Sequence, residues 1–265
     1  MLESKIGIVM GIANSRSIAT HIAEGLANSN AKMIFTHLPD APGKDRNKKR
    51  LLSITEKMNP LFIAPCDVTS DEELDKFFNE VKEKYGKIDF LVHSIAFAPT
   101  DDLKKDTIES SREGFSKAMD ISVYSLLAVC SRVKPLMKEG GNIITMSYYG
   151  GQKVMPGYNL MGLCKAALES AVRYAAFELG QNNISINAIS AGPVKTLAAS
   201  AVGDFKSMLS LYSSSNSMKR NITGSDISGL ANFLLDEKSR MITGEVIHLD
   251  GGFHSLGCSK TLEQL

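Results

Sequence analysis

Two tyrosines and a lysine in the middle of the chain have the residue types and spacing for chemistry on a developing negative charge. Tyr148 follows a short apolar run, and Tyr158 and Lys165 lie in a later segment with helical periodicity. A phenol can donate a hydrogen bond to an oxygen on which charge develops, and an ammonium group favours that charge. A single tyrosine at a strand end is more often a packing residue, so only the three residues together indicate such chemistry.

A turn with the features of a phosphate-binding loop follows the first apolar run. Gly11 begins the turn, Ala13 stands where a G-x-G-x-x-G motif would have its second glycine, and Ser17 and Ile18 open a helical segment. Small residues allow the backbone to approach a pyrophosphate, and the amides and dipole of a helix N-terminus attract its charge. Only Gly11 fits the motif cleanly, so an ordinary strand-to-helix turn explains this segment equally well.

Two further turns follow later apolar runs. Asp67 and Val68 come after the third run, and Ser94, Ile95 and Ala96 come after the fourth. The aspartate can accept a hydrogen bond from an adenine amino group, and the small residues allow the backbone to approach a ribose or a nicotinamide. Since parallel strands end at the same edge of a sheet, the three turns together predict a dinucleotide site.

The elements that must position these residues follow from an alternation of short apolar runs with segments of helical periodicity. This alternation predicts an α/β fold: one Rossmann-like domain with a doubly wound, seven-stranded parallel sheet and helices on both faces. A length of 265 residues fits one such domain. The strands are expected at 6–10, 31–36, 61–65, 88–93, 142–146, 185–189 and 245–249. The helices are expected at 17–28, 45–58, 71–85, 111–137, 158–181 and 225–235.

One connection is unusually apolar. Residues 193–220 join the sixth predicted strand to the last predicted helix and contain Val202, Phe205 and Met208 among other apolar residues. The connection leaves the edge of the sheet at which ligands bind, so it is a candidate helical lid over the substrate. A pair of amphipathic helices packed on the core fits the same pattern.

Composition restricts the class of protein. Hydrophobic residues make up 43% and charged residues 22% of the chain, and 30 basic against 29 acidic residues leave a formal charge of +1. Such a balance gives no electrostatic reason to expect nucleic acid or an anionic membrane as the principal partner, and no apolar run is long enough to predict membrane insertion. Without a leader-like N-terminus or a membrane-length apolar run, we expect a cytoplasmic protein. The four cysteines are scattered and lack neighbouring histidines, so we expect reduced thiols and no metal.

Four stretches, 145–151, 158–165, 192–200 and 250–253, resemble the bacterial enoyl-acyl-carrier-protein reductases of the short-chain dehydrogenase/reductase superfamily. The similarity runs from about residue 7 to residue 253. Members of the superfamily that reduce carbonyl groups space their tyrosine and lysine by four residues, whereas Tyr158 and Lys165 are seven apart. The wider spacing adds about 4.5 Å along a helix, so the tyrosine can reach further from the cofactor.

The resemblance implies reduction of trans-2-enoyl thioesters carried on acyl carrier protein, with a hydride moving from a nicotinamide cofactor to the β carbon. Tyr158 would then stabilise the enolate, Lys165 would hold the nicotinamide ribose, and Tyr148 would position the substrate. The three turns and the resemblance place cofactor contacts at Gly11, Ala13, Ser17, Ile18, Asp67, Val68, Ser94, Ile95, Ala96, Lys165, Gly192, Pro193, Val194 and Thr196. Substrate contacts are expected at Phe97, Ala98, Tyr148, Tyr158, Met161, Ala199, Val202, Phe205 and Met208.

The end of the second predicted strand departs from the usual pattern. An enzyme that prefers NADH commonly has an acidic residue there to bind the adenosine ribose, but the first acidic residue after this strand is Asp40, four positions beyond Thr36. Lys44 and Arg46, the nearest residues suited to a ribose phosphate, lie still further along. We expect NADH in preference to NADPH. Ala96 also stands where the family often has glycine.

Assembly and alternative functions follow from the same features. Long helices at 111–137 and 158–181 would suit the homotetramer that is common in the superfamily, although they suit a dimer as well. A carbonyl or pteridine reductase with a displaced tyrosine is one alternative function, and the seven-residue spacing argues against it. A non-catalytic nicotinamide-binding regulator is another, but the chain retains both Tyr158 and Lys165.

Overall fold

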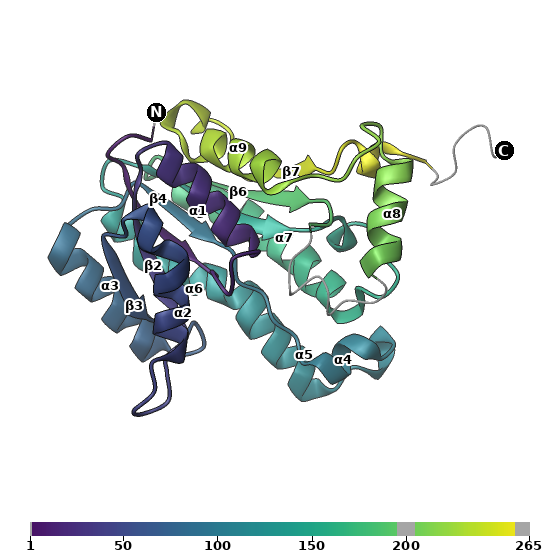
Figure 1. Ribbon diagram of the computed structural model, residues 1–265, viewed down its shortest axis with the longest axis horizontal. Coiled ribbons are helices and arrows are strands. Elements are labelled where there is room, and N and C mark those ends of the chain that lie inside the picture. Colours follow the sequence, from purple (N-terminus) through teal and green to yellow (C-terminus); the bar gives the residue numbers. More distant parts are fainter. Residues whose placement is uncertain (1, 195–204, 258–265) are drawn as a thin grey trace.

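A parallel sheet forms the centre of the computed structural model, which describes residues 2–194 and 205–257 (Figure 1). Its seven strands have the order β3-β2-β1-β4-β5-β6-β7, and every neighbouring pair is parallel. The strands are β1 (Ile6–Met10), β2 (Lys32–His37), β3 (Phe62–Pro65), β4 (Phe90–His93), β5 (Gly141–Ser147), β6 (Ile184–Ala191) and β7 (Val246–Leu249). The chain reverses its direction of winding between β1 and β4, so a crevice for ligands is expected at their carboxyl ends.

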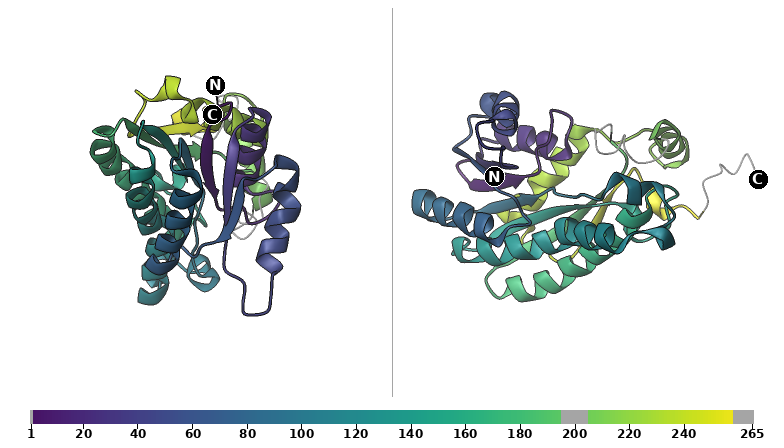
Figure 2. Two further views of the ribbon diagram at one scale, coloured as in Figure 1. Left: turned by 90° about the vertical axis from the view of Figure 1, so that its left-hand side faces the viewer. Right: turned by 90° about the horizontal axis from the view of Figure 1, so that it is seen from below.

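Helices cover both faces of the sheet (Figure 2). One layer contains α1 (Ile18–Asn28), α2 (Arg46–Thr55) and α9 (Gly224–Leu235), and the other contains α3 (Asp71–Tyr85), α5 (Arg112–Met119), α6 (Ser125–Val133) and α7 (Asn159–Gly180). Each layer buries its own hydrophobic core against the sheet. Two further helices, α4 (Thr100–Lys104) and α8 (Phe205–Ser215), lie beyond the carboxyl ends of the strands. The predicted doubly wound, seven-stranded architecture is therefore confirmed.

Local signals in the sequence explain several helix starts. The Ser70 hydroxyl accepts a hydrogen bond from the Glu73 amide at the start of α3, whose first turn contains three acidic residues. Thr223 and Asp226 form a reciprocal capping box at the start of α9. Both arrangements satisfy amides that have no partner inside the helix. Within the described ranges, no helix is long and apolar enough to cross a membrane.

The prediction of one continuous helix over 111–137 is wrong in detail. A π-helical turn, Asp120–Tyr124, separates α5 from α6, and a 3₁₀ turn follows at Lys134–Leu136. Within the π-helical turn, the Ser122 hydroxyl accepts a hydrogen bond from the Phe97 amide and donates one to the Phe97 carbonyl, both at 3.0 Å. The interruption therefore fixes the loop that follows β4, and π-helical turns often occur beside functional sites.

Candidate active site

The turns after β1 and β4 touch one another. Gly11 has a φ of +103°, and a Cβ atom at this position would collide with the Ser94 carbonyl oxygen. The Ser94 amide donates a hydrogen bond of 3.1 Å to the Met10 carbonyl. Only glycine permits this close approach, so two of the predicted cofactor turns form one surface at the crevice.

The N-terminus of α1 fits a bound anion. Ser17 precedes the helix, and its hydroxyl accepts hydrogen bonds from the Ala13 and Asn14 amides at 3.2 and 3.0 Å. Because this hydroxyl points back into the turn, no side chain caps the first-turn amides that begin at Ile18. Uncapped amides at a helix start are suitable donors for a pyrophosphate.

The turn after β3 is held by its own side chains. Asp67 accepts hydrogen bonds from the Thr69 amide and hydroxyl at 2.9 and 2.8 Å, and its own amide donates to Glu73 at 2.7 Å. Val68 is buried in the core. The Asp67 carboxylate is thus already oriented by the turn that carries it.

The segment after β6 runs beside β7. The Gly192 amide donates a hydrogen bond of 2.8 Å to the Leu249 carbonyl, Pro193 is buried, and Val194 packs on the core. Of the other cofactor residues expected near the cleft, Ile95 is half-buried and Ala96 is exposed. Thr196 lies outside the described residues.

Asp40 has a structural role that its position in the sequence did not reveal. Its carboxylate accepts hydrogen bonds from the Asn47 and Lys48 amides, at 2.7 and 3.0 Å, in the first turn of α2. Partial burial raises the pKa of this carboxyl, but the two amide bonds outweigh it and lower the pKa overall. Asp40 therefore caps α2.

Tyr148 and Tyr158 lie together at the carboxyl end of β5. Tyr158 immediately precedes α7 and is half-buried, and Tyr148 has 8% of its surface exposed. Their rings meet edge to face, with 4.6 Å between centroids. Burial raises the pKa of both phenols, so both stay protonated near neutral pH. Among the described residues, no side chain bonds to the Tyr158 hydroxyl, which leaves this donor open to a ligand.

The described part of the expected lid reaches Tyr148. Two side chains of α8 contact the Tyr148 hydroxyl: the Met208 sulfur lies 3.5 Å from it, and the Tyr212 hydroxyl lies 3.1 Å from it. Ala199 and Val202 lie outside the described residues, as does the side chain of Phe205. Of the substrate contacts expected elsewhere, Phe97 is 44% exposed, whereas Ala98 and Met161 are buried in the core.

Lys165 is a buried cation, with only 6% of its surface exposed. Its ammonium group donates a hydrogen bond of 2.7 Å to the Met146 carbonyl of β5. Burial lowers the pKa of this amine to about 8, although Cys164 and Glu169 act in the opposite direction. Lys165 therefore remains mostly charged at neutral pH and is fixed against β5, the strand that ends just before Tyr148.

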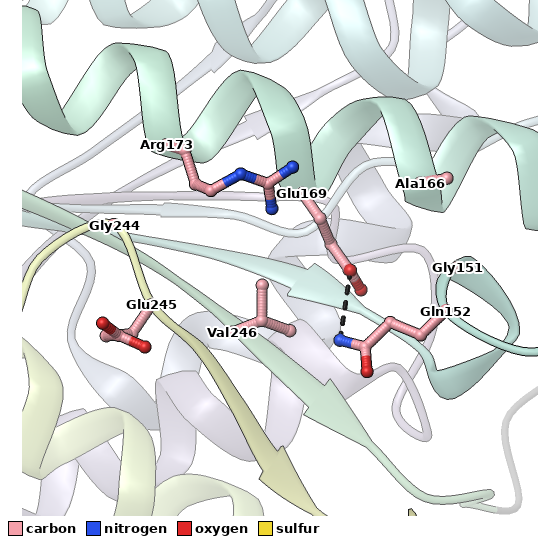
Figure 3. Close-up of a pocket in the computed structure, with 8 residues that line it drawn as sticks. All are labelled: Gly151, Gln152, Ala166, Glu169, Arg173, Gly244, Glu245 and Val246. Carbon is pink, nitrogen blue, oxygen red and sulfur yellow. Dashed lines mark hydrogen bonds between the residues drawn. The ribbon is translucent and has the colours of Figure 1, made fainter.

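Glu169 was missed by the sequence analysis. Its buried carboxylate lies one turn beyond Lys165 and accepts a hydrogen bond of 2.5 Å from the Ser147 hydroxyl. It also accepts one of 3.2 Å from the Gln152 side-chain amide, which Figure 3 shows. It thus joins α7 to the end of β5 and to the loop after Tyr148. An open pocket of about 550 Å³ adjoins it, lined by Gly151, Gln152, Ala166, Glu169, Arg173, Gly244, Glu245 and Val246. The sequence signal that could have identified Glu169 is the presence of an acidic residue four positions after Lys165.

His93, at the end of β4, was also missed. Its ring nitrogens lie 3.2 Å from the Thr145 hydroxyl and 2.9 Å from the Ser125 hydroxyl. Burial, together with the nearby charge of Lys165, lowers the pKa of this imidazole to about 3. His93 is therefore a neutral link between β4, β5 and α6.

Comparison with known proteins agrees with this geometry. The family model described as Enoyl-(Acyl carrier protein) reductase matches residues 11–254. The chain is 44% identical to the NADH enoyl-acyl-carrier-protein reductase 1 of Rhizobium meliloti, over 97% of this chain and 93% of that protein.

Two solved structures are similar throughout. The Anaplasma phagocytophilum enoyl-acyl-carrier-protein reductase in complex with NAD gives a TM-score of 0.93 at 40% identity, covering 98% of this chain and 97% of that one. The Bacillus cereus enzyme with NADP⁺ and an indole naphthyridinone gives 0.93 at 44% identity, covering 97% and 99%. The chain therefore belongs to the enoyl-acyl-carrier-protein reductase family.

Proposed function

We propose that this protein is an NADH-dependent enoyl-acyl-carrier-protein reductase that saturates trans-2-enoyl thioesters in fatty-acid elongation. The observation that carries the proposal is the protonated Tyr158 phenol, which has no partner among the described side chains and lies against Tyr148. The Rhizobium meliloti relative is named for this reaction and this cofactor. The seven-residue interval to Lys165 supports it over carbonyl reduction.

The chain has groups that fit the cofactor. The uncapped amides of α1 and the close approach at Gly11 would hold the pyrophosphate, and Lys165 would bind the nicotinamide ribose. The backbone of 192–194 would meet the carboxamide, and Asp67 the adenine. Bound NADH supplies the hydride that reaches the β carbon.

The tyrosines and the lysine act on the other end of the enone system. Negative charge develops on the thioester oxygen, and Tyr158 donates a hydrogen bond to it. Tyr148 positions the thioester, and the Lys165 cation favours the charge electrostatically. A donor held in a partly buried site stabilises such an oxyanion more strongly than water does.

Choice of cofactor is part of the proposal. Because Asp40 caps α2, it contributes little to recognition of the adenosine ribose. NADH remains our proposed reductant, with NADPH as a weaker substitute, in keeping with the name of the Rhizobium meliloti relative and the NAD held by the Anaplasma phagocytophilum structure.

A paired assay tests the proposed reaction. Crotonyl thioester on acyl carrier protein is mixed with NADH or NADPH, and loss of the reduced nicotinamide absorbance is followed. We expect turnover with the enoyl thioester and none with ketones or pteridines. Turnover confined to carbonyl substrates would instead indicate a carbonyl or pteridine reductase. Cofactor binding without any turnover would indicate a non-catalytic nicotinamide-binding regulator.

We also propose a homotetramer in the cytoplasm, where acyl carrier protein and NADH occur. Apolar side chains on one helical layer are exposed to solvent in the single chain: Phe115, Tyr124, Leu127, Leu163, Tyr174 and Phe177. Contact with α5, α6 and α7 of a second copy would cover this layer, and the open edge of β7 offers a second contact. Light scattering after size-exclusion chromatography should give the mass of four chains, and the mass of one would contradict this assembly.

A further inference from the structure

Tyr212 connects α8 to the candidate active site. Only 1% of its surface is exposed, although it is a large residue with a polar hydroxyl. Its ring stacks on Phe253, with 3.9 Å between centroids and 17° between planes. Its hydroxyl lies 3.1 Å from the hydroxyl of Tyr148. One side chain therefore joins the turn after β7 to a tyrosine of the site.

The direction of the hydroxyl bond follows from the neighbouring sulfur. The Tyr148 hydroxyl lies 3.5 Å from the Met208 sulfur, and a thioether can accept but not donate a hydrogen bond. Tyr148 has one hydroxyl proton, which it directs to the sulfur. Its oxygen therefore accepts the proton of Tyr212. Since Met208 and Tyr212 are four residues apart on α8, both side chains face Tyr148.

The ring of Tyr212 has a firm support. Phe253 follows Asp250, whose buried carboxylate accepts hydrogen bonds from the amides of Gly252, Phe253 and His254 at 2.9, 3.1 and 3.0 Å. These bonds hold the turn that carries Phe253. The stack on Phe253 thus fixes the Tyr212 ring independently of the bond to Tyr148.

We propose that Tyr212 is a positioning residue that holds the Tyr148 side chain beside Tyr158 and directs its proton towards the substrate. The inference rests on the proposed function. Because Tyr212 is the donor in the bond between the two hydroxyls, Tyr148 keeps its own O–H for another acceptor. When substrate binds, this O–H can turn from the Met208 sulfur, a weak acceptor, to the thioester oxygen. A hydroxyl that accepts one hydrogen bond also becomes a better donor of the next.

Tyr212→Phe is the direct test, because it keeps the stacked ring and removes the hydroxyl. With the enoyl thioester we expect kcat to fall about fivefold, as loss of one hydrogen bond would give, with an unchanged KM for NADH. Tyr85→Phe is the matched control. Tyr85 is the last residue of α3, away from the site, and its hydroxyl donates a hydrogen bond of 2.9 Å to the Leu61 carbonyl. This variant should keep the kcat of the unmodified enzyme.

Pairing the substitution with Tyr148→Phe separates positioning from a general structural effect. If Tyr212 acts through Tyr148, the double variant has the kcat of Tyr148→Phe alone. The inference is overturned if Tyr212→Phe lowers kcat equally in both backgrounds or in neither. It is also overturned if Tyr148→Phe itself leaves kcat unchanged.

Thermal unfolding of the same three variants gives a readout that does not need turnover. The hydroxyl bond predicts a double variant destabilised by less than the sum of the single variants, and additive shifts would overturn the inference. Absence of enoyl reduction by the unmodified enzyme, together with non-additive shifts, would instead refute the proposed function and leave the Tyr148–Tyr212 bond established.

Discussion

The Lys165 ammonium group lies 2.7 Å from the Met146 carbonyl oxygen, to which it donates a hydrogen bond from within the protein. An ammonium group has three N–H donors. Because this bond uses one of them, and the described residues accept no other, two donors remain for a ligand. Lys165 can therefore bind the two hydroxyls of a ribose while it stays fixed to β5.

Replacing Lys165 with alanine should weaken NADH binding. Loss of hydrogen bonds from a charged donor should raise the Kd by roughly tenfold to a hundredfold. Fluorescence titration of the reduced nicotinamide measures this directly. Lys84→Ala is the control, since Lys84 is an exposed lysine paired with Glu80 on α3. Equal Kd values for the two variants would remove Lys165 from the cofactor site.

Binding of NADH should also depend on pH. The pKa of Lys165 is lowered from 10.5 to about 8 by burial, so its charge is lost as the pH rises through about 8. Affinity for NADH should therefore be greatest below that pH and decline above it. The same titration repeated at several pH values tests this, with Lys165→Ala as the reference that should lack the decline. A decline of equal size in the variant would assign it to another group.

The same shift in the pKa of Lys165 has the opposite effect on stability, which should rise with pH whereas NADH affinity falls. Between about pH 8 and 10.5, the unfolded chain holds the Lys165 proton while the folded chain has released it. The contribution of this residue to the free energy of unfolding therefore increases with pH across that interval. Lys165→Met should flatten this increase in denaturant unfolding, and an unchanged slope would show that the folded-state pKa is not lowered.

Asp40→Ala should lower the melting temperature without changing the cofactor preference. The substitution removes two hydrogen bonds to the first-turn amides of α2. Because the pKa of Asp40 is lowered in the folded state, its stabilising effect should also disappear in the unmodified protein as the pH falls through that pKa. A marked loss of NADH affinity in Asp40→Ala would instead identify Asp40 as the ribose-binding acid.

Much of this site could be predicted from the alternation of apolar runs and helical segments along the chain. This alternation predicts a parallel sheet, and the turns after parallel strands meet at one edge. The segments concerned contain Gly11, Ser94, Tyr148 and Lys165. The contact of Gly11 with Ser94 and the pairing of Tyr148 with Tyr158 follow from that rule. Strand positions were likewise predictable because each strand is a short apolar run between helical segments.

Other features depend on side-chain packing that no local pattern encodes. Tyr148 and Tyr212 are 64 residues apart, and their contact depends on where α8 lies. The partners of Asp40 could not be predicted because a carboxylate in a loop can reach several different amides. Nor does periodicity reveal a π-helical turn, since Ser122 is drawn to the backbone of Phe97 by a tertiary contact.

Glu169→Ala should destabilise the protein by about 2 kcal/mol, because the Ser147 hydroxyl and the Gln152 amide would lose their acceptor. Urea unfolding measures the change. Glu245→Ala provides a matched control, since Glu245 lines the same pocket but is exposed (Figure 3). Equal stability of the two variants would show that the Glu169 network contributes nothing to the fold.

The role of Tyr158 is tested most directly by the kcat of Tyr158→Phe with crotonyl thioester and saturating NADH. We expect a fall of about tenfold to a hundredfold, the effect of losing one hydrogen bond to a developing anion, with an unchanged Kd for NADH. A Tyr158→Phe enzyme that turns over the enoyl thioester as fast as the unmodified enzyme would contradict this role.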